Sequence, residues 1–311
     1  MLDRYINLLK SSQVVAFPTE TVYGLGAVAS DGGAVRKIFE IKQRPPDNPL
    51  IVHIASHKML HEITNKIPDK AEKLMSAFWP GALTLIFEKK PRVLDIITAG
   101  LPTVAVRWPS HPLSQDLIAR VGPLVAPSAN SSGKPSPTKP EHIKEDLGES
   151  FPVIEAGETQ IGLESTVLDV TQKPFQLYRP GAISRKQIEK VIDEQIITVQ
   201  AKEVEQPKSP GMKYSHYAPD AAVRWLRAGE APEDEQTLYL IHYEVPEFEA
   251  DNIVNFAENY DEMAHQLFDR FRSADHKGYK IIAIEPFPED VLKREPLAEA
   301  LQNRISKAIG I

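Results

Sequence analysis

Two cations separated by one residue, Lys42 and Arg44, begin a proline-rich segment that runs from residue 42 to residue 50. In extended backbone, side chains two positions apart point to the same side, so both charges would face one ligand. The three prolines of this segment disfavour helix and stiffen it. An arginine fork beside a lysine point charge suits an oligophosphate. The alternative is a solvated basic loop at a helix C-terminus, where the helix dipole attracts cations.

Small hydroxyl and amide side chains crowd a second segment, residues 126–138, which contains the sequence Pro-Ser-Ala-Asn. Such side chains let backbone N–H groups approach a ligand closely, although the same composition also fits a turn-rich surface loop. Polar groups also stand at expected strand ends: Arg107 follows an apolar run, Ser165 begins one, and Arg179 precedes Pro-Gly in an expected rigid turn. Cations and hydroxyls so placed are what a site for ATP and an amino acid requires.

The glycines of residues 24–29 match the weak dinucleotide-binding pattern G-x-G-x-x-[GA], with Asp47 in the place of a ribose carboxylate. A helix cap is expected only later, at Ser30 or Asp31, so these glycines do not open a helix as that pattern requires. We therefore interpret the segment as a glycine-rich turn between elements. The P-loop pattern G-x-x-x-x-G-K-[ST] is absent from the sequence.

Short β-rich runs alternate with helical patterns over the first two-thirds of the chain, which predicts an α/β or α+β sheet with helices packed on it. The expected strands are residues 14–17, 50–54, 83–87, 103–106 and 165–168. Helices are expected after the cap at residue 30 or 31 and over 71–78, 113–121 and 184–192, the last capped by Ser184. The chain then becomes polar over 201–209, the best candidate for a linker.

The last third of the chain has its own pattern of elements. Strands are expected at 222–226, 237–243 and 281–284, with helices over 260–271 and 297–305. A helical crossover between strands favours a parallel pair, so this pattern predicts a smaller Rossmann-like α/β domain. A length of 311 residues fits two such domains.

The composition excludes several classes of protein. With no cysteine, the chain has no disulfides, thiolate nucleophiles or cysteine-rich metal sites, which fits a reducing compartment. We read no secretory signal, and no apolar run approaches the ~18 residues of a membrane helix. The net charge is −7, and residues 228–269 hold twelve acidic residues and no lysine or arginine. This balance argues against a surface built mainly to bind nucleic acid.

Histidines 53, 57 and 61 recur every four residues, a spacing that on one helix would suggest a metal site. However, His53 falls in the expected strand 50–54, and Ser56 has the features of a helix cap, so we expect no metal site from these histidines. Glu20 and Glu164 could form an acid–base pair, but such carboxylates are more often structural partners of nearby cations, and we make no catalytic claim for them.

Seven segments together resemble the threonylcarbamoyl-adenylate synthase family, whose catalytic part is the YrdC-like domain. Six occur in the family's order: residues 17–26, 42–50, 105–109, 127–130, 162–169 and 179–181. A seventh, residues 209–219, is similar to the interdomain linker of the long, two-domain branch. The resemblance implies a YrdC-like domain with a twisted mixed sheet at 1–203, a linker over the active site at 204–220, and the Rossmann-like domain at 221–311.

The resemblance further implies an enzyme that converts L-threonine, bicarbonate and ATP to threonylcarbamoyl-AMP and pyrophosphate, with magnesium on the phosphates. The product serves a cytoplasmic transferase that modifies an adenosine of tRNA, so the chain itself would bind tRNA weakly or indirectly and no membrane. Carried over by motif, the ATP-binding residues are Lys42 and Arg44, which are also the catalytic pair, with Asn48, Thr103, Ser128, Asn130, Ser136, Arg179, Tyr214, Ser215 and His216. The threonine-binding residues are Thr21, His53, Arg107 and Ser165.

Two other functions remain open at this level. The same domain type could serve as an RNA-binding module, although the acidic balance opposes that as a main role. It could also be a maturation factor for metalloenzymes that adenylates a carbamoyl group. Factors of that kind resemble larger chains with cysteine-rich zinc modules, and this chain has no cysteine.

Overall fold

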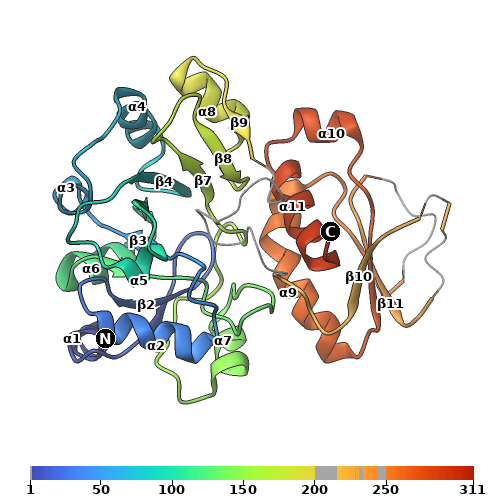
Figure 1. Cartoon of the computed structure of the whole chain (residues 1–311). Coiled ribbons are helices and arrows are strands. Elements are labelled where there is room, and N and C mark those ends of the chain that lie inside the picture. Colours follow the sequence, from blue (N-terminus) through green and yellow to red (C-terminus); the bar gives the residue numbers. More distant parts are fainter. Residues whose placement is uncertain (1, 200–215, 228, 231–233, 244–249) are drawn as a thin grey trace.

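The structure, a computed structural model, describes residues 2–199, 216–227, 229–230, 234–243 and 250–311. These residues form two lobes, each built around its own sheet (Figure 1). Within the described ranges, no helix is long and apolar enough to cross a membrane. The expected linker at 201–209 lies outside the described residues.

The first lobe holds a nine-stranded mixed sheet in the order β1-β2-β6-β3-β5-β4-β7-β8-β9. Three neighbouring pairs are parallel, β3 with β5, β4 with β7 and β8 with β9, and the other pairs are antiparallel. The strands are β1 (Val15–Phe17), β2 (Gly24–Val28), β3 (Ile51–His53), β4 (Leu83–Glu88), β5 (Thr103–Arg107), β6 (Leu124–Val125), β7 (Thr166–Asp169), β8 (Gln176–Arg179) and β9 (Ile197–Thr198). The predicted mixed sheet with flanking helices is confirmed.

The described residues of this lobe also form eight helices, of which the first precedes strand β1 and the other seven lie between strands. They are α1 (Leu2–Lys10), α2 (Gly32–Lys42), α3 (His57–Ile63), α4 (Asp69–Phe78), α5 (Asp95–Thr98), α6 (Pro112–Val121), α7 (Pro140–Leu147) and α8 (Arg185–Ile192). Asp31 caps α2 by accepting from the N–H groups of Gly33 and Ala34, and Ser184 caps α8 in a capping box with Gln187. Both predicted caps are therefore present.

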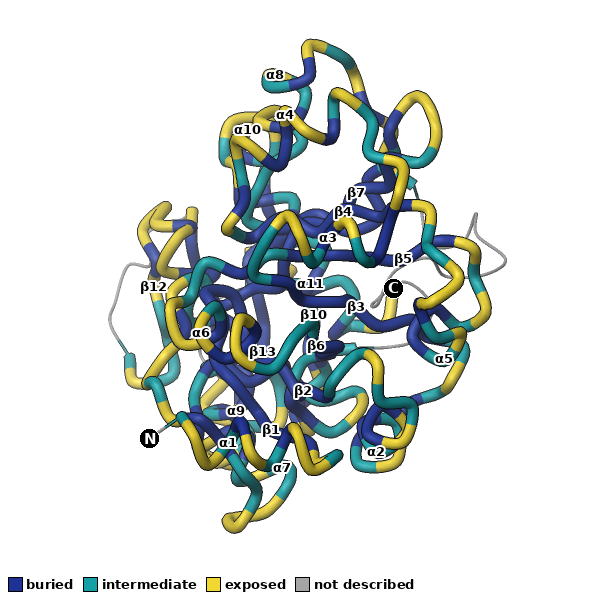
Figure 2. The backbone as a smooth tube through the Cα atoms, turned by 90° about the vertical axis from the view of Figure 1, so that its left-hand side faces the viewer, coloured by how far each residue is buried: buried dark blue, intermediate teal, exposed yellow. Residues whose placement is uncertain are grey.

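Helices cover both faces of the sheet, as strand β1 shows. Val15 and Phe17 pack with Leu117 of α6, whereas Ala16 packs in a larger cluster with Ile38 of α2. Alternate residues of a strand point to opposite faces, so a strand covered on both faces is apolar throughout. Figure 2 shows the resulting buried central strands β3, β4, β5 and β7, with exposed residues gathered in outer loops and helices.

Three predictions about local structure are wrong. Residues 24–28 form strand β2 and not a turn, because Gly26 gives the Phe17 ring room: a Cβ at residue 26 would lie 2.7 Å from that ring. The backbone from Lys42 to Arg44 is not extended either. Lys42 is the last residue of α2, and Gln43 follows in the left-handed region at φ 50°. Arg179 ends strand β8 instead of lying on a turn.

The second lobe holds four parallel strands in the order β10-β13-β11-β12. They are β10 (Ala222–Trp225), β11 (Thr237–Ile241), β12 (Ile253–Asn255) and β13 (Ile281–Ile284), and the helices are α9 (Tyr260–Lys277), α10 (Glu289–Arg294) and α11 (Ala298–Ile309). This confirms the small Rossmann-like α/β lobe, with β12 as a strand that the sequence did not predict. Helices α9 and α11 lie on the side that faces the first lobe (Figure 1).

The core of the second lobe continues into the first. Val22 and Leu163 of the first lobe belong to the same buried cluster as Leu267 of α9 and Leu301 of α11. Gly162 lies so close to α9 that a Cβ there would be 2.4 Å from the carbonyl oxygen of Ala264. The two lobes are therefore packed together at the segment that immediately precedes strand β7.

Candidate active site

A pocket of about 730 Å³, partly open to solvent, lies where several strand ends of the first lobe meet the loop of residues 126–138. Eleven of the residues predicted from the sequence line it: Thr21, Lys42, Arg44, His53, Arg107, Ser128, Asn130, Ser136, Ser165, Arg179 and His216. Segments from across the chain are thus brought together at one place.

Four predicted residues are not placed in this pocket. Asn48 and Thr103 are both described and buried, but neither lines it. Thr103 begins strand β5 and Arg107 ends it, which puts them about 13 Å apart at the usual rise per residue. Tyr214 and Ser215 lie outside the described residues.

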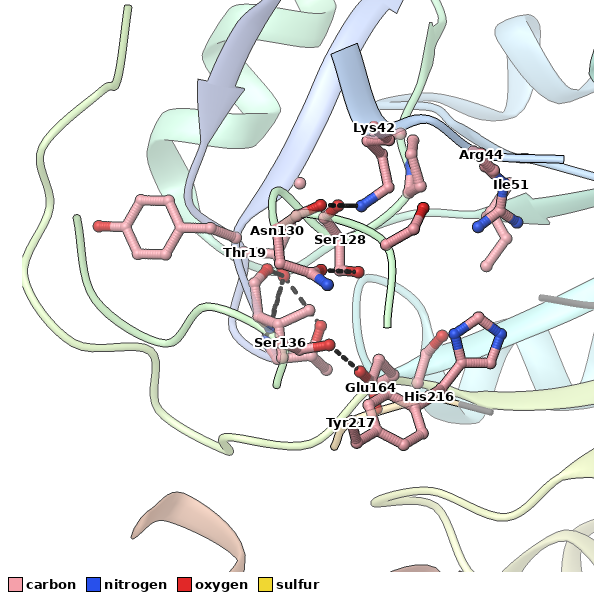
Figure 3. A pocket seen from close by; sticks show the side chains of 18 of the residues that line it. Thr19, Lys42, Arg44, Ile51, Ser128, Asn130, Ser136, Glu164, His216 and Tyr217 are labelled. Carbon is pink, nitrogen blue, oxygen red and sulfur yellow. Dashed lines mark hydrogen bonds between the residues drawn. The ribbon is translucent and has the colours of Figure 1, made fainter. Parts of the chain in front are cut away.

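Lys42 joins the end of helix α2 to the loop that follows strand β6. Its Nζ donates to the carbonyl oxygen of Ser128 at 2.7 Å and to that of Asn130. Burial lowers the pKa of Lys42 well below the usual lysine value, and the nearby Arg44 lowers it further. Figure 3 shows this side chain directed at the loop that carries Ser128 and Asn130.

Arg44 closes the tight turn that follows. Its Nε donates to the carbonyl of Asn48 at 3.3 Å and its NH2 group to the carbonyl of Pro49 at 3.1 Å. The Oδ1 atom of Asn48 is buried and has no hydrogen-bond partner among the described residues. A buried acceptor without a hydrogen bond lowers the stability of the fold unless a ligand or water donates to it. Asn48 Oδ1 is such an acceptor, in a residue that contacts the pocket-lining Arg44.

The loop of residues 126–138 is fixed by backbone contacts with strand β2. Leu25 N donates to the Pro127 carbonyl at 2.8 Å, and Ala129 N donates to the Tyr23 carbonyl at 2.9 Å. The Asn130 side chain stays inside the loop, where its Nδ2 donates to the Lys134 carbonyl at 2.9 Å. These contacts make the loop a positioned wall of the pocket and not a free surface turn.

Arg107, which also lines the pocket, already contacts two neighbouring side chains. Its guanidinium donates to Thr21 Oγ1 at 2.8 Å and forms a buried ion pair with Glu20 Oε1 at 2.7 Å. Glu20 is thus a structural partner of a cation, the role that the sequence favoured. Ser165 Oγ lies 2.8 Å from Thr84 Oγ1 and accepts from Arg179 at 3.1 Å.

His53 ends strand β3 in the same region. Burial lowers its pKa to about 3, and the charge of Arg107 contributes to the shift, so the imidazole is neutral near pH 7. Its Nδ1 lies 3.2 Å from the Ile51 carbonyl and donates to it in the neutral tautomer that leaves Nε2 as an acceptor. His57 and His61 lie on helix α3, so the three histidines do not share an element.

His216 and Tyr217 enter the pocket from the segment before the second lobe. Burial lowers the pKa of His216 to about 4, with the charge of Arg44 also acting against protonation. The Nε2 atom of His216 is buried and has no partner within the described part of the chain. Tyr217 is stacked on Phe268 of α9 with 5.2 Å between ring centroids.

Sequence reasoning missed some of the lining. Thr19 and Tyr217 lie within segments that carried the family resemblance, so the motifs held a signal for both. The sequence favoured a structural role for Glu164, and this residue accepts from Ser136 Oγ and from Arg304 Nε, the latter at 2.7 Å (Figure 3 shows the Ser136 pair). Nothing in the sequence pointed to Arg304, which lies in the polar-looking terminal helix α11.

Comparison with known proteins agrees with this geometry. The family model described as "Telomere recombination" matches residues 7–181, and that of the "Threonylcarbamoyl-AMP synthase, C-terminal domain" matches residues 183–310. The threonylcarbamoyl-AMP synthase of Pyrococcus abyssi is 44% identical over 320 residues, covering 97% of this chain and 92% of that protein. The Bacillus subtilis enzyme of the same name is 44% identical over 322 residues, covering 97% and 91%.

A solved structure is similar over both lobes. The crystal structure of P. abyssi Sua5 complexed with L-threonine superposes with a TM-score of 0.88 at 41% identity, covering 99% of this chain and 94% of that one. Both family models and full-length relatives therefore agree on one assignment. The chain belongs to the threonylcarbamoyl-AMP synthase family, in the branch that carries the C-terminal domain.

Proposed function

We propose that this chain converts L-threonine, bicarbonate and ATP to threonylcarbamoyl-AMP, pyrophosphate and water. The observation that carries the proposal is one pocket that is lined by the cations Lys42 and Arg44 and also by Thr21, His53 and Arg107. The related P. abyssi protein was crystallised with L-threonine, which supports an amino-acid subsite in this fold.

The reaction has two bond-forming steps. The threonine amine attacks the carbon of bicarbonate, which loses water, or of carbon dioxide formed from bicarbonate by the same loss of water; in the second case the amine also releases a proton, and either route gives a carbamate. A carbamate oxygen then attacks the α-phosphorus of ATP, and pyrophosphate leaves. Neither step needs a protein nucleophile, so the work of the chain is to position the reactants and stabilise charge. A chain without cysteine is compatible with this chemistry.

We assign two groups of pocket-lining residues to the two substrates. Lys42, Arg44 and Arg179 would contact the phosphates, since cations that face one space stabilise charge on an oligophosphate. Ser128, Asn130 and Ser136 would hold the nucleotide. A nucleotide contact of Asn48, which does not line the pocket, stays a prediction from the motifs. Thr103, Tyr214 and Ser215 remain predictions from the motifs alone.

The group assigned to threonine combines a neutral acceptor, His53, with a charged donor, Arg107. Arg107 would bind the substrate carboxylate, with Thr21 and Ser165 beside it. The Nε2 of neutral His53 is an acceptor that can hydrogen-bond the substrate amine or hydroxyl. Because Arg107 is already paired with Glu20, we expect it to act as a fixed anchor that adds one contact without moving.

A magnesium ion fits this site only as a companion of ATP. Glu164 is the one carboxylate among the described lining residues, and Ser136 and Arg304 already engage its two oxygens. The described residues also hold no group of three or more side chains of metal-ligating type. Magnesium would therefore be held by the phosphates and water, where it would neutralise charge on the departing pyrophosphate.

The wider role follows from the product. Threonylcarbamoyl-AMP would be consumed by a transferase that modifies an adenosine of tRNA, and we expect this in the cytoplasm, where ATP and tRNA occur together. We place the end of the catalytic domain near residue 203, because strand β9 at Ile197–Thr198 still belongs to the nine-stranded sheet. The linker at 204–220 would close over the site and protect the carbamate from water.

A substrate-omission experiment tests the proposed reaction. Purified protein should release pyrophosphate from ATP and magnesium only when threonine and bicarbonate are both supplied, and mass spectrometry should detect threonylcarbamoyl-AMP. Replacing threonine with valine, which lacks the hydroxyl, should lower turnover strongly. Pyrophosphate release without threonine, or none with the full set, contradicts the assignment.

A further inference from the structure

The pocket proposed for ATP contains an ionised carboxylate, which is an unexpected group to place beside phosphates. Glu164 is 6% exposed and lines the pocket together with Ser136 and Arg179. Burial raises the pKa of its carboxyl, but the charges of Arg304 and Arg179 lower it more, so the net shift is downward and Glu164 stays ionised. An unpaired negative charge at this position would oppose the binding of a polyphosphate.

The second lobe supplies the main partner of this carboxylate. Arg304, on helix α11, has no exposed surface, and its Nε donates to Glu164 Oε2 at 2.7 Å. Its NH2 group lies 3.4 Å from the Glu164 carbonyl, and its NH1 group donates to Asn303 Oδ1 at 2.8 Å. The guanidinium also lies over the Tyr217 ring, 5.5 Å from the centroid. A fully buried arginine is rarely tolerated unless it is paired.

The ion pair of Arg304 and Glu164 contacts the loop of residues 126–138, which we call the nucleotide loop. The other oxygen of Glu164, Oε1, accepts from Ser136 Oγ, so Arg304, Glu164 and Ser136 form one chain of contacts from the second lobe to the pocket. A second arginine of that lobe holds the same loop next to Ser136, because Arg272 on α9 donates to the Pro135 carbonyl at 2.6 Å. Two separate helices of the second lobe therefore hold consecutive residues of this loop.

We propose that Arg304 is a positioning residue for the nucleotide. It neutralises Glu164, so that this carboxylate can hold Ser136 in place without repelling the phosphates. The inference rests on the proposed ATP site and deepens it: the second lobe supplies a charge that the nucleotide subsite needs. The inference predicts that loss of Arg304 weakens ATP binding and that removal of the Glu164 charge restores it. If Arg304 served only to join the two lobes, removal of the Glu164 charge would not restore ATP binding.

The first test removes the charge of Arg304. Arg304→Met should raise KM for ATP by roughly ten- to a hundredfold, because an uncompensated charge a few ångström away in a partly buried site acts with that strength. KM for threonine should change by less than about threefold, since Arg107 and His53 remain in place. Arg304→Lys keeps the charge and should recover most of the ATP affinity.

The second test removes both charges. The double variant Arg304→Met with Glu164→Gln should bind ATP at least about fivefold better than Arg304→Met alone, because no unpaired carboxylate remains. In Arg304→Met, ATP affinity should also improve as the pH falls from 8 to 6, because Glu164 without its partner can take up a proton. The other groups that act on Glu164 are Arg179, Tyr217 and His216, and His216, with its pKa of about 4, does not titrate in this range.

Arg294→Met is the matched control. Arg294 lies in the same lobe and pairs with Glu258, but both side chains are nearly half exposed, so its loss should leave KM for ATP unchanged. Binding of a non-hydrolysable ATP analogue, measured by calorimetry alongside circular dichroism, separates this inference from the proposed reaction. If wild-type protein binds the analogue but releases no pyrophosphate, the reaction is wrong and the Arg304 comparison still decides the inference.

Three results would overturn the inference. The first is an unchanged KM for ATP in Arg304→Met, the second a double variant as weak as the single one, and the third an Arg304→Lys protein as weak as Arg304→Met. Should Arg304→Met fail to fold, the comparison of Arg304→Lys with wild type decides the question, since retained charge must retain ATP affinity.

Discussion

At the scale of single residues, the site contains buried titratable groups whose pKa values are lowered. Lys42 is enclosed by the carbonyls of Ser128 and Asn130, which are dipoles and not charges, so its positive charge is not cancelled by them. His53 and His216 are neutral at physiological pH because burial and nearby cations oppose protonation. Substitutions of Lys42 and His53 test these features.

Replacing Lys42 should abolish turnover while leaving the fold intact. Lys42→Ala should lower kcat/KM for ATP by at least about a hundredfold, since a buried cation directed at a phosphate acts mainly on the charged transition state. Lys37→Ala is the matched control, because Lys37 lies on the same helix and donates to the Ser12 carbonyl at 2.9 Å outside the pocket. Pyrophosphate release measures both, and near-normal turnover in Lys42→Ala contradicts the phosphate role.

Buried neutral His53 should make the protein sensitive to acid. Its pKa is about 3 in the folded chain and about 6.5 when unfolded, so the unfolded state binds the extra proton as the pH falls below 6.5. Between pH 7 and pH 5 this histidine should cost about 2 kcal/mol of stability. His53→Gln should lose less stability over that interval in urea titrations, whereas the exposed His61→Gln should behave as wild type.

At the scale of elements, the pocket depends on how short connecting segments are held. Ile161 N donates to the Glu20 carbonyl at 2.8 Å and Gly162 N donates to the Thr21 carbonyl at 3.0 Å. Gly162, with φ at +83°, also lies against the backbone of α9. Residues 161 and 162 therefore lie between the segment that carries Thr21 and helix α9.

Gly162→Ala should be far more damaging than the same change at Gly157. Both glycines have positive φ, so each alanine variant should pay about 1 kcal/mol of backbone strain. Only at residue 162 would the new Cβ meet backbone, 2.4 Å from the Ala264 carbonyl, whereas at residue 157 nothing lies within 4 Å. Urea unfolding should show at least about 2 kcal/mol of further loss for Gly162→Ala, and equal losses would contradict the close approach.

At the scale of the whole molecule, buried charges join the two lobes. Arg272 of α9 binds Asp146 through two contacts of 3.0 and 2.8 Å, and both side chains are less than one-tenth exposed. Asp269 of the same helix contacts Lys139 and His142, and these contacts lower the pKa of its carboxyl. Together with the shared apolar cluster, these contacts make the lobes one cooperative unit.

Breaking one of these contacts should separate the unfolding of the two lobes. Wild-type protein should unfold in a single calorimetric transition, whereas Arg272→Met should show two, because removal of one partner from a buried ion pair costs about 3–5 kcal/mol. Arg294→Met, which breaks only a half-exposed pair, should keep the single transition. Two transitions in the wild type would contradict the coupling.

The sequence predicted those features that leave a local pattern. Strands buried on both faces appear as apolar runs, and Asp31 and Ser184 mark their helices through caps. Strands β6 and β9 were missed because two residues are too few to show a pattern. β2 was missed because its glycines serve packing against Phe17.

The site residues also fall into those that a local sequence pattern predicted and those that it did not. Segments that carry recognisable motifs came together in the pocket. Arg304 was not predicted, because its partner Glu164 lies 140 residues away in the chain and no local pattern connects the two. The neighbours of Arg304, Gln302 and Asn303, give the helix a polar, surface-like sequence. The conformation of residues 42–44 was also wrongly predicted, since the helix before them continues through Lys42.

The contact chain from Arg304 through Glu164 to Ser136 has a consequence for how members of this family can be recombined. The two lobes are not exchangeable modules. A hybrid that takes residues beyond the linker from a relative must bring an arginine at the position of Arg304, or replace Glu164 as well. A natural or engineered chimaera that keeps the carboxylate of Glu164 but loses the arginine would have both lobes folded and would bind ATP weakly.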